Sequence, residues 1–171
     1  MNKITYSKIN SSLSHRYLFI HNVDLEEKKD LPQKMLLEES RLILPISSRG
    51  LEVFELTETG EVIKTGCYQC LPISTAVARN KAFIIDKSSP NKVKFVDLDT
   101  LMALEQSIDL GSWKNPFLSA GGGHVVIAWN VMEVSLHGSG KDHIKVYSLD
   151  KEKVVTSLSS TFYTVCDGLP L

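Results

Sequence analysis

An internal repeat constrains the fold of this chain more than any other feature of its sequence. Three six-residue segments align without gaps: Leu51–Leu56, Val93–Leu98 and Ile144–Leu149. In each hexad an aliphatic residue is followed by a charged residue, an apolar residue, an aromatic residue or Val, a polar residue and Leu. Alternation with a period of two, rich in β-branched and aromatic residues, is typical of half-buried strands. We therefore predict three strands whose first and third residues point inward.

Each hexad has similar neighbours on both sides. A turn and a second apolar stretch follow it, which indicates a hairpin. Upstream lie three denser apolar segments, typical of strands buried on both faces, namely Arg41–Ile46, Lys81–Asp86 and His124–Trp129. A short strand candidate and a tight turn precede each of these segments. One unit is thus predicted to contain four consecutive strands.

The repeat predicts one β-repeat domain over residues 1–171. Its full units are expected at 34–70, 71–111 and 115–160. Residues 1–33 would form a partial unit, with 16–21 as one strand. Residues 161–171 would start a further unit.

Residues 34–160 resemble the blades of a β-propeller, loosely of the WD-repeat or quinoprotein-like kind. The resemblance rests on the length of the unit, the strand order and the hexads. The Gly-His and Trp-Asp dipeptides of WD repeats are absent at the equivalent places, and Trp129-Asn130 falls on a different strand. The resemblance implies an all-β fold of three to four four-stranded antiparallel blades around a central channel.

Two features leave a β-sandwich or β-meander open as the alternative fold. Pro45 falls inside a predicted central strand, where its missing N–H costs a ladder hydrogen bond. Residues 31–40 read equally well as a short helix with Pro32 in the first turn, and residues 101–107 are similarly ambiguous.

About three and a half blades are fewer than the roughly four to eight of a closed propeller. The chain is therefore expected to be an incomplete propeller: part of a longer one, or one that self-associates or docks its open blade ends on a protein partner. A small four-bladed ring is the alternative, closed by pairing residues 161–166 with 16–21.

The composition excludes some classes of partner. Nineteen basic and twenty acidic side chains leave a net charge of −1, so we expect no nucleic-acid and no membrane partner. The longest apolar stretch, Val125–Trp129, is far shorter than a membrane span, and the N-terminus has no apolar signal region. We expect a cytoplasmic protein.

No motif predicts catalysis, a cofactor or a metal. Cys67 and Cys70 form a C-x2-C pair, but a zinc site needs a second such pair, which the sequence lacks, or two histidines with three to five residues between them. His137 and His143 have five residues between them, at the limit of that spacing. The segment 137–142 (HGSGKD) resembles the end of a phosphate-binding loop but has Asp142 where Ser or Thr is required. Two loop cysteines and a surface loop are the simpler interpretations.

The third unit has a long predicted loop, at about 131–142, between its second and third strands. Long loops on repeat scaffolds often carry function, although a tolerated insertion is the alternative. The candidate interaction residues are His137, Ser139, Lys141, Asp142 and His143. Together these features favour a non-enzymatic protein-interaction or scaffold module. A ligand-binding or enzymatic propeller domain, with a site in the central channel, is the alternative.

Overall fold

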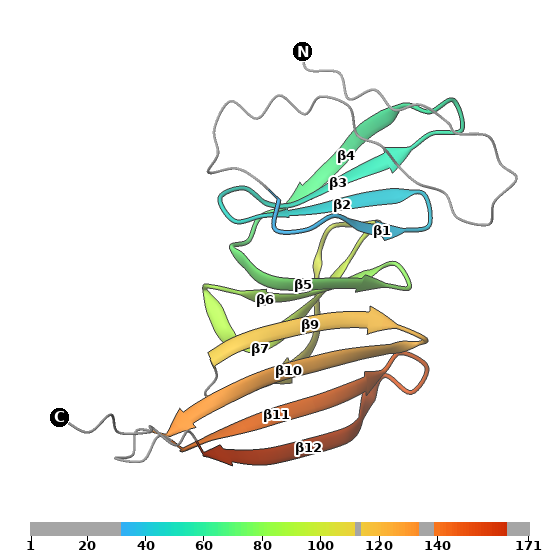
Figure 1. Ribbon diagram of the computed structural model, residues 1–171. Helices are drawn as coiled ribbons and strands as arrows, with labels where there is room; N and C mark the ends of the chain where they lie inside the picture. The colour runs from blue at the N-terminus through green and yellow to red at the C-terminus, as the bar shows by residue number, and fades with distance from the viewer. Residues whose placement is uncertain (1–31, 112–113, 134–138, 164–171) are drawn as a thin grey trace, which may run out of the picture. The chain divides into compact units, whose positions relative to one another are not determined.

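The computed structural model describes residues 32–111, 114–133 and 139–163, and this part of the chain consists of strands, turns and short connections (Figure 1). Its contacts divide the chain into two compact units, Met1–Leu71 and Pro72–Leu171.

One antiparallel sheet forms the described part of the first unit. Its strands are β1 (Leu36–Glu38), β2 (Arg41–Ile46), β3 (Gly50–Leu56) and β4 (Val62–Tyr68), and they pair in chain order. Leu42, Ile43, Leu51 and Val53 are buried in it.

The second unit contains two further sheets of the same design. The first comprises β5 (Pro72–Ala78), β6 (Lys81–Asp86), β7 (Ser89–Asp97) and β8 (Ala103–Asp109). The second comprises β9 (Lys114–Gly121), β10 (His124–Glu133), β11 (Ser139–Ser148) and β12 (Lys153–Tyr163). The two sheets stack, with β9 beside β5 (Figure 1).

The predicted fold class is confirmed. The described chain is all-β and forms three four-stranded antiparallel sheets, as expected of incomplete propeller blades. All strand pairs join neighbours in the sequence, and the described strands contain no Greek-key crossover of the kind found in sandwiches.

Neither of the two regions that could also be interpreted as a helix is helical. Leu36–Glu38 pairs with Arg41–Ile43 as a strand, and most of 101–107 belongs to β8. Pro45 does lie in β2, opposite Leu51. It lies beyond the end of the three-residue β1, and its carbonyl oxygen accepts a hydrogen bond from the Gln33 N–H at 2.9 Å. A full ladder is therefore not required on that side of Pro45.

The core of the second unit lies between its two sheets. Phe95 stacks edge-on against both Phe83 and Tyr147, with ring centroids 4.8 and 5.2 Å apart. The side chains buried together are Ala76, Phe83, Ile85, Val93, Phe95, Ile108, Leu110, Leu118, Val125, Ile127, Trp129, Tyr147 and Leu149. Residues of both sheets therefore form one continuous apolar core.

The predicted orientation of the hexads is confirmed in two copies and wrong in the third. The first and third residues are buried in β3 (Leu51, Val53) and in β7 (Val93, Phe95). In β11 the third, Val146, is only half-buried and the first, Ile144, is exposed; Tyr147, the fourth, enters the core instead. The reason is that β9–β12 packs on β5–β8 through its opposite face.

The predicted long loop is largely strand. Val131–Glu133 extend β10 and pair with Ser139–Lys141 of β11, so the connection shortens to residues 134–138. Thr161–Tyr163, expected in a further unit, extend β12 and pair with Ser139–Lys141. Residues 1–31, including the segment 16–21, and residues 164–171 lie outside the described residues, as does the pairing predicted between them.

Candidate functional site

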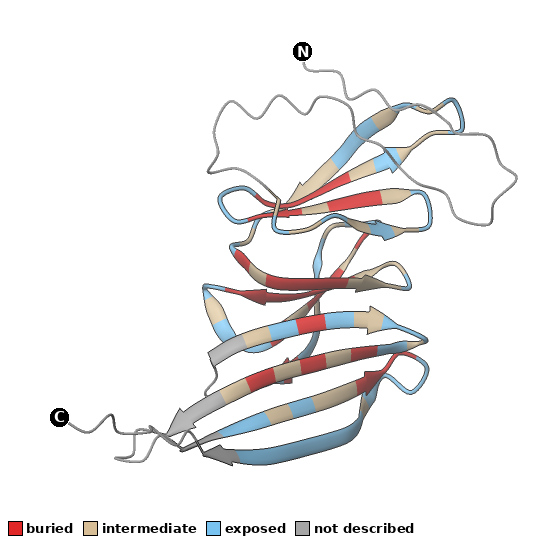
Figure 2. Ribbon diagram, in the orientation of Figure 1, coloured by how far each residue is buried: buried red, intermediate tan, exposed pale blue. Residues whose placement is uncertain are grey.

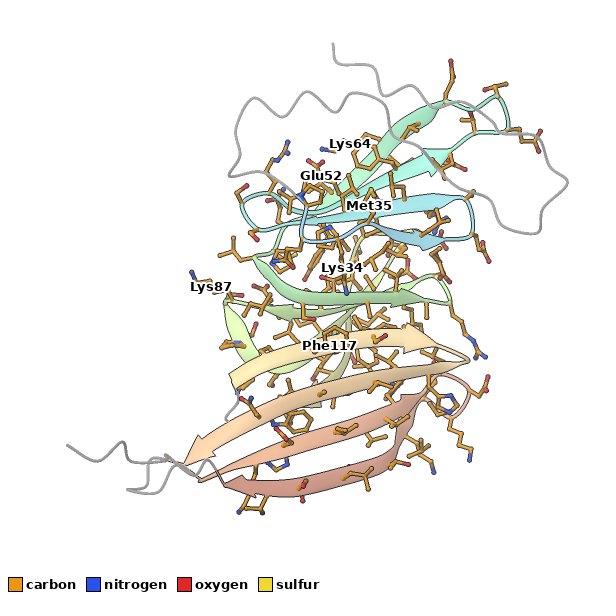
Figure 3. All side chains as sticks on the ribbon, in the orientation of Figure 1. Lys34, Met35, Glu52, Lys64, Lys87 and Phe117 are labelled. Carbon is orange, nitrogen blue, oxygen red and sulfur yellow. The ribbon has the colours of Figure 1, made fainter. Side chains whose placement is uncertain are left out.

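An apolar row crosses the sheet β9–β12 on the face that points away from β5–β8. Ala128 of β10 pairs with Phe117 of β9 and with Ile144 of β11, and Ile144 pairs with Leu158 of β12. Directly paired residues lie on the same face of a sheet, so the four form one line. Phe117, Ile144 and Leu158 are 57%, 38% and 61% exposed, and Phe117 projects from β9 in Figure 3. We call this line the apolar row.

The corresponding line in β5–β8 is covered. In that sheet Ser74 pairs with Ile85, and Val93 pairs with Ile108. The repeat aligns Ile85 with Ala128 and Val93 with Ile144. Ile85 and Val93 are fully buried in the core shared with the next sheet.

A direct hydrogen bond fixes the cover over that line. The buried backbone N–H of Leu118 in β9 donates to Ser74 Oγ at 2.9 Å. The apolar row therefore occupies the position at which the preceding sheet receives its neighbour. Within the described part of the chain, the row has no such neighbour.

The surroundings of the apolar row are nearly neutral. A second line of directly paired residues lies two residues farther along the strands from the apolar row. It consists of Ser119, Val126, Val146 and Thr156. On the other side, Asn130 pairs with Asp142, which pairs with Ser160. Asn130 also pairs with Lys114 of β9, so this line contains one basic and one acidic residue. We call these three lines together the open face.

The opposite face of the same sheet carries charged contacts that hold it to β5–β8. Lys145 Nζ donates to the Asp109 carbonyl oxygen at 2.7 Å and lies 5.5 Å from the centre of the Trp129 ring. Lys81 Nζ lies 3.1 Å from Glu152 Oε1. The two faces of β9–β12 thus differ, because one packs on β5–β8 and the other is covered by none of the strands in 32–111, 114–133 and 139–163.

The predicted interaction residues do not gather at one point. Asp142 lies on the open face, whereas Lys141 and His143 alternate with it along β11 and belong to the other face. His143 stacks on Trp129, with ring centroids 5.2 Å apart and an angle of 15°. Ser139 is in β11 opposite Glu133, and His137 lies outside the described residues.

Sequence reasoning missed how the charged second residue of each hexad is used. Glu52 is buried, and its carboxylate lies 2.7 Å from Lys64 Nζ in the first unit (Figure 3). Lys94 Nζ lies 3.1 Å from the buried Asp86 carboxylate, and Lys145 makes the contacts described above. The repeated charge at this position was the available signal, because a charge that recurs inside a buried strand needs a partner.

The described residues offer no group of three His, Cys, Asp or Glu side chains that could hold a metal ion. Cys67 and Cys70 are half-buried and form no disulfide; the Cys67 thiol contacts the Arg49 carbonyl oxygen at 3.2 Å. In the described ranges there is no helix that is long and apolar enough to span a membrane.

Comparison with known proteins found no matching family model and no matching curated protein. Among solved structures, the computationally designed Ika8 protein is similar over 72% of this chain and 48% of its own, with a TM-score of 0.42 and 12% identity. The Pan2 WD40 domain of Neurospora crassa is similar over 74% of this chain and 51% of its own, with a TM-score of 0.37 and 10% identity. The chain thus spans about half the length of both structures.

Proposed function

We propose that this chain is a non-enzymatic protein-interaction module that binds a protein partner through the open face of β9–β12. The single observation that carries the proposal is the apolar row, which lies exposed where the equivalent line of β5–β8 is covered. Contiguous exposed apolar surface in a globular protein marks an interaction site.

Covering the apolar row would contribute favourable free energy to binding. Full burial of a Leu, Ile or Phe side chain contributes about 1.5–3 kcal/mol, so covering the exposed half or so of Phe117, Ile144 and Leu158 contributes about 1 kcal/mol each. Polar residues border the row on one side, where Asn130, Asp142 and Ser160 lie. On the other side Val126 and Val146 widen the apolar centre, and Ser119 and Thr156 flank them. An apolar centre with a polar rim is the usual anatomy of a protein interface.

The partner surface that fits is itself a sheet face. The cover on β5–β8 consists of aliphatic and aromatic residues from β9, β10 and the end of β11, namely Leu118, Val125, Ile127, Trp129, Tyr147 and Leu149. A flat apolar sheet surface would make the same kind of contact with the open face. The balanced charge of the chain supports a protein, rather than a nucleic acid, as partner.

The test compares two substitutions of exposed apolar residues in the tagged full-length chain, expressed in its native cells. Phe117→Asp places a charge in the apolar row. Met102→Asp changes an equally apolar residue, 68% exposed, that precedes β8 and lies outside the open face. Proteins that co-purify with the unchanged chain should be reduced at least tenfold by Phe117→Asp, because a charge cannot be buried there without a partner, and retained by Met102→Asp.

Two outcomes would contradict the proposal. In one, both variants retain the same co-purifying proteins as the unchanged chain. In the other, both variants lose them equally. Circular dichroism of each variant establishes that the sheets are intact.

A further inference from the structure

β12 is an edge strand with unusual properties. It spans 11 residues, pairs with β11 on one side, and has no partner on the other side among the described strands. Residues 155–161 are all exposed, and Figure 2 shows the strand almost entirely in the colour of exposed residues. An exposed edge of this length presents a row of backbone donors and acceptors to any strand that can pair with it.

The outer strands of the other two sheets carry the features that usually prevent such pairing. β4 and β8 have seven residues each, and both contain charges: Lys64 in β4, and Glu105 and Asp109 in β8. After Lys153, β12 contains neither a charged residue nor a proline. Short length, charge, proline and β-bulges are the devices that block edge-to-edge association. β12 has a bulge at Val155, and from Thr156 to Tyr163 it contains no charge, proline or bulge.

We propose that β12 pairs with β12 of a second copy of this chain, antiparallel and about a two-fold axis at Leu158. The two sheets would then form one continuous sheet of eight strands. A neutral strand suits pairing with itself, because no like charges come to lie opposite one another. The two-fold symmetry is the usual form of association between identical chains.

The apolar row sets the register. With the axis at Leu158, the side chains of Leu158 from the two copies face each other, and Thr156 faces Ser160 of the second copy. The apolar row of one copy then continues directly into that of the other, from Phe117 through Leu158 in each. A shift by one residue would instead place Leu158 opposite a serine.

This inference deepens the proposed function, because it identifies a partner for the same sheet, but it uses the edge of the sheet and not its face. The two can therefore fail separately. Phe117 is on β9, the strand farthest from β12 in the sheet order. Phe117→Asp should abolish face binding and leave edge pairing intact.

Size-exclusion chromatography with light scattering tests the pairing on the full chain. The unchanged chain should have twice its mass of 19.1 kDa. Thr156→Lys/Ser160→Lys should reduce the mass to that of a monomer, because the two new lysines oppose each other across the axis. Thr156→Glu/Ser160→Lys should restore the dimer, because each new glutamate faces a new lysine of the other copy. Within one copy, a lysine at position 160 lies beside Asp142, so the sheet itself should tolerate it.

A cross-linking experiment checks the register without relying on charged variants. Leu158→Cys should form a disulfide between copies under mild oxidation, and Thr156→Cys should not, because two copies of residue 156 lie four residues apart across the axis. A monomeric unchanged chain, a double-lysine variant that stays dimeric, or a Glu/Lys variant that stays monomeric would each overturn the inference. Loss of the dimer in Phe117→Asp would instead assign self-association to the open face.

Discussion

Arg79 and Asp150 form an ion pair that joins two turns 71 residues apart in the sequence, with Arg79 Nη1 2.5 Å from Asp150 Oδ1. Arg79 lies in the turn after β5, and Asp150 lies in the turn after β11. The ion pair therefore links a turn of the sheet β5–β8 to a turn of the sheet β9–β12. The Arg79 guanidinium, through its hydrogen bond and its charge, lowers the pKa of Asp150 below the usual value for a carboxyl group.

This pair should make the second unit sensitive to acid. Because the pKa of Asp150 is lowered in the folded state, its contribution to stability is present above the ordinary pKa of an aspartate and is lost as the pH falls through the folded-state pKa. The melting temperature should therefore fall as the pH drops below about 5, and less steeply in Asp150→Asn. Asp142→Asn, which changes an exposed carboxylate on the open face, is the control and should keep the slope of the unchanged chain. Identical slopes for all three proteins would contradict this role.

Tyr147 should make the stability of the second unit decrease as the pH rises in the alkaline range. Burial, and secondarily the negative charge of Glu152, raise the pKa of Tyr147 above its ordinary value of 10.0. The unfolded chain therefore loses this proton at lower pH than the folded chain, so stability should decline as the pH rises above that value. Tyr147→Phe removes the group. The difference in melting temperature between the two proteins should change from about pH 8 to about pH 11, and a constant difference would exclude the effect.

Ser74→Ala should weaken the contact between the two sheets of the second unit. The substitution removes the buried hydrogen bond from the Leu118 N–H to Ser74 Oγ at 2.9 Å. Removing one partner of a buried hydrogen bond costs about 1–3 kcal/mol, which urea unfolding can measure. Ser119→Ala changes the adjacent, exposed serine of β9 and should cost less than about 0.5 kcal/mol. Equal effects from both would argue against a structural role for Ser74.

Gly50→Ala should be strongly destabilising in the first unit. Gly50 begins β3 with a φ of +100°, and an added Cβ would collide with the Tyr68 carbonyl oxygen. Positive φ alone costs a non-glycine residue about 1–2 kcal/mol, and the collision adds to this. Gly111→Ala provides the comparison, since Gly111 has a φ of +72° and no atom within 4 Å of the added Cβ. Thermal unfolding should show a clearly larger loss for Gly50→Ala than for Gly111→Ala.

The strand pattern could be predicted from the sequence because each sheet is built from neighbours along the chain. Arg41–Ile46 and Lys81–Asp86 coincide with β2 and β6. The turn chemistry and alternation act over a few residues, so they are visible in one sequence. The helical interpretation of residues 31–40 failed because Leu36–Glu38 gains a ladder with β2 that local propensity does not include.

The open face was harder to predict, because it depends on which face of a sheet is covered. Val146 and Phe95 occupy equivalent positions in the hexads and read alike in sequence. Phe95 is buried because another sheet lies over it, whereas Val146 belongs to the last described sheet. Long-range packing decides this difference, and periodicity alone carries no information about it. The extended hairpin of β10 and β11 was missed for a related reason, since polar residues such as Asp142 pair in a ladder there.

The pairing of strands only with their neighbours in the sequence has a consequence for the order of folding. Each hairpin closes over a short loop, so the entropy lost in forming a sheet is small at every step. A sheet such as β5–β8 can assemble as soon as its own four strands are available during synthesis, before β9 exists. The arrival of β9, with the Leu118 N–H directed at Ser74, would then begin to cover one face of that sheet. The chain would thus gain stability in discrete increments, one sheet at a time, from the N-terminal side to the C-terminal side.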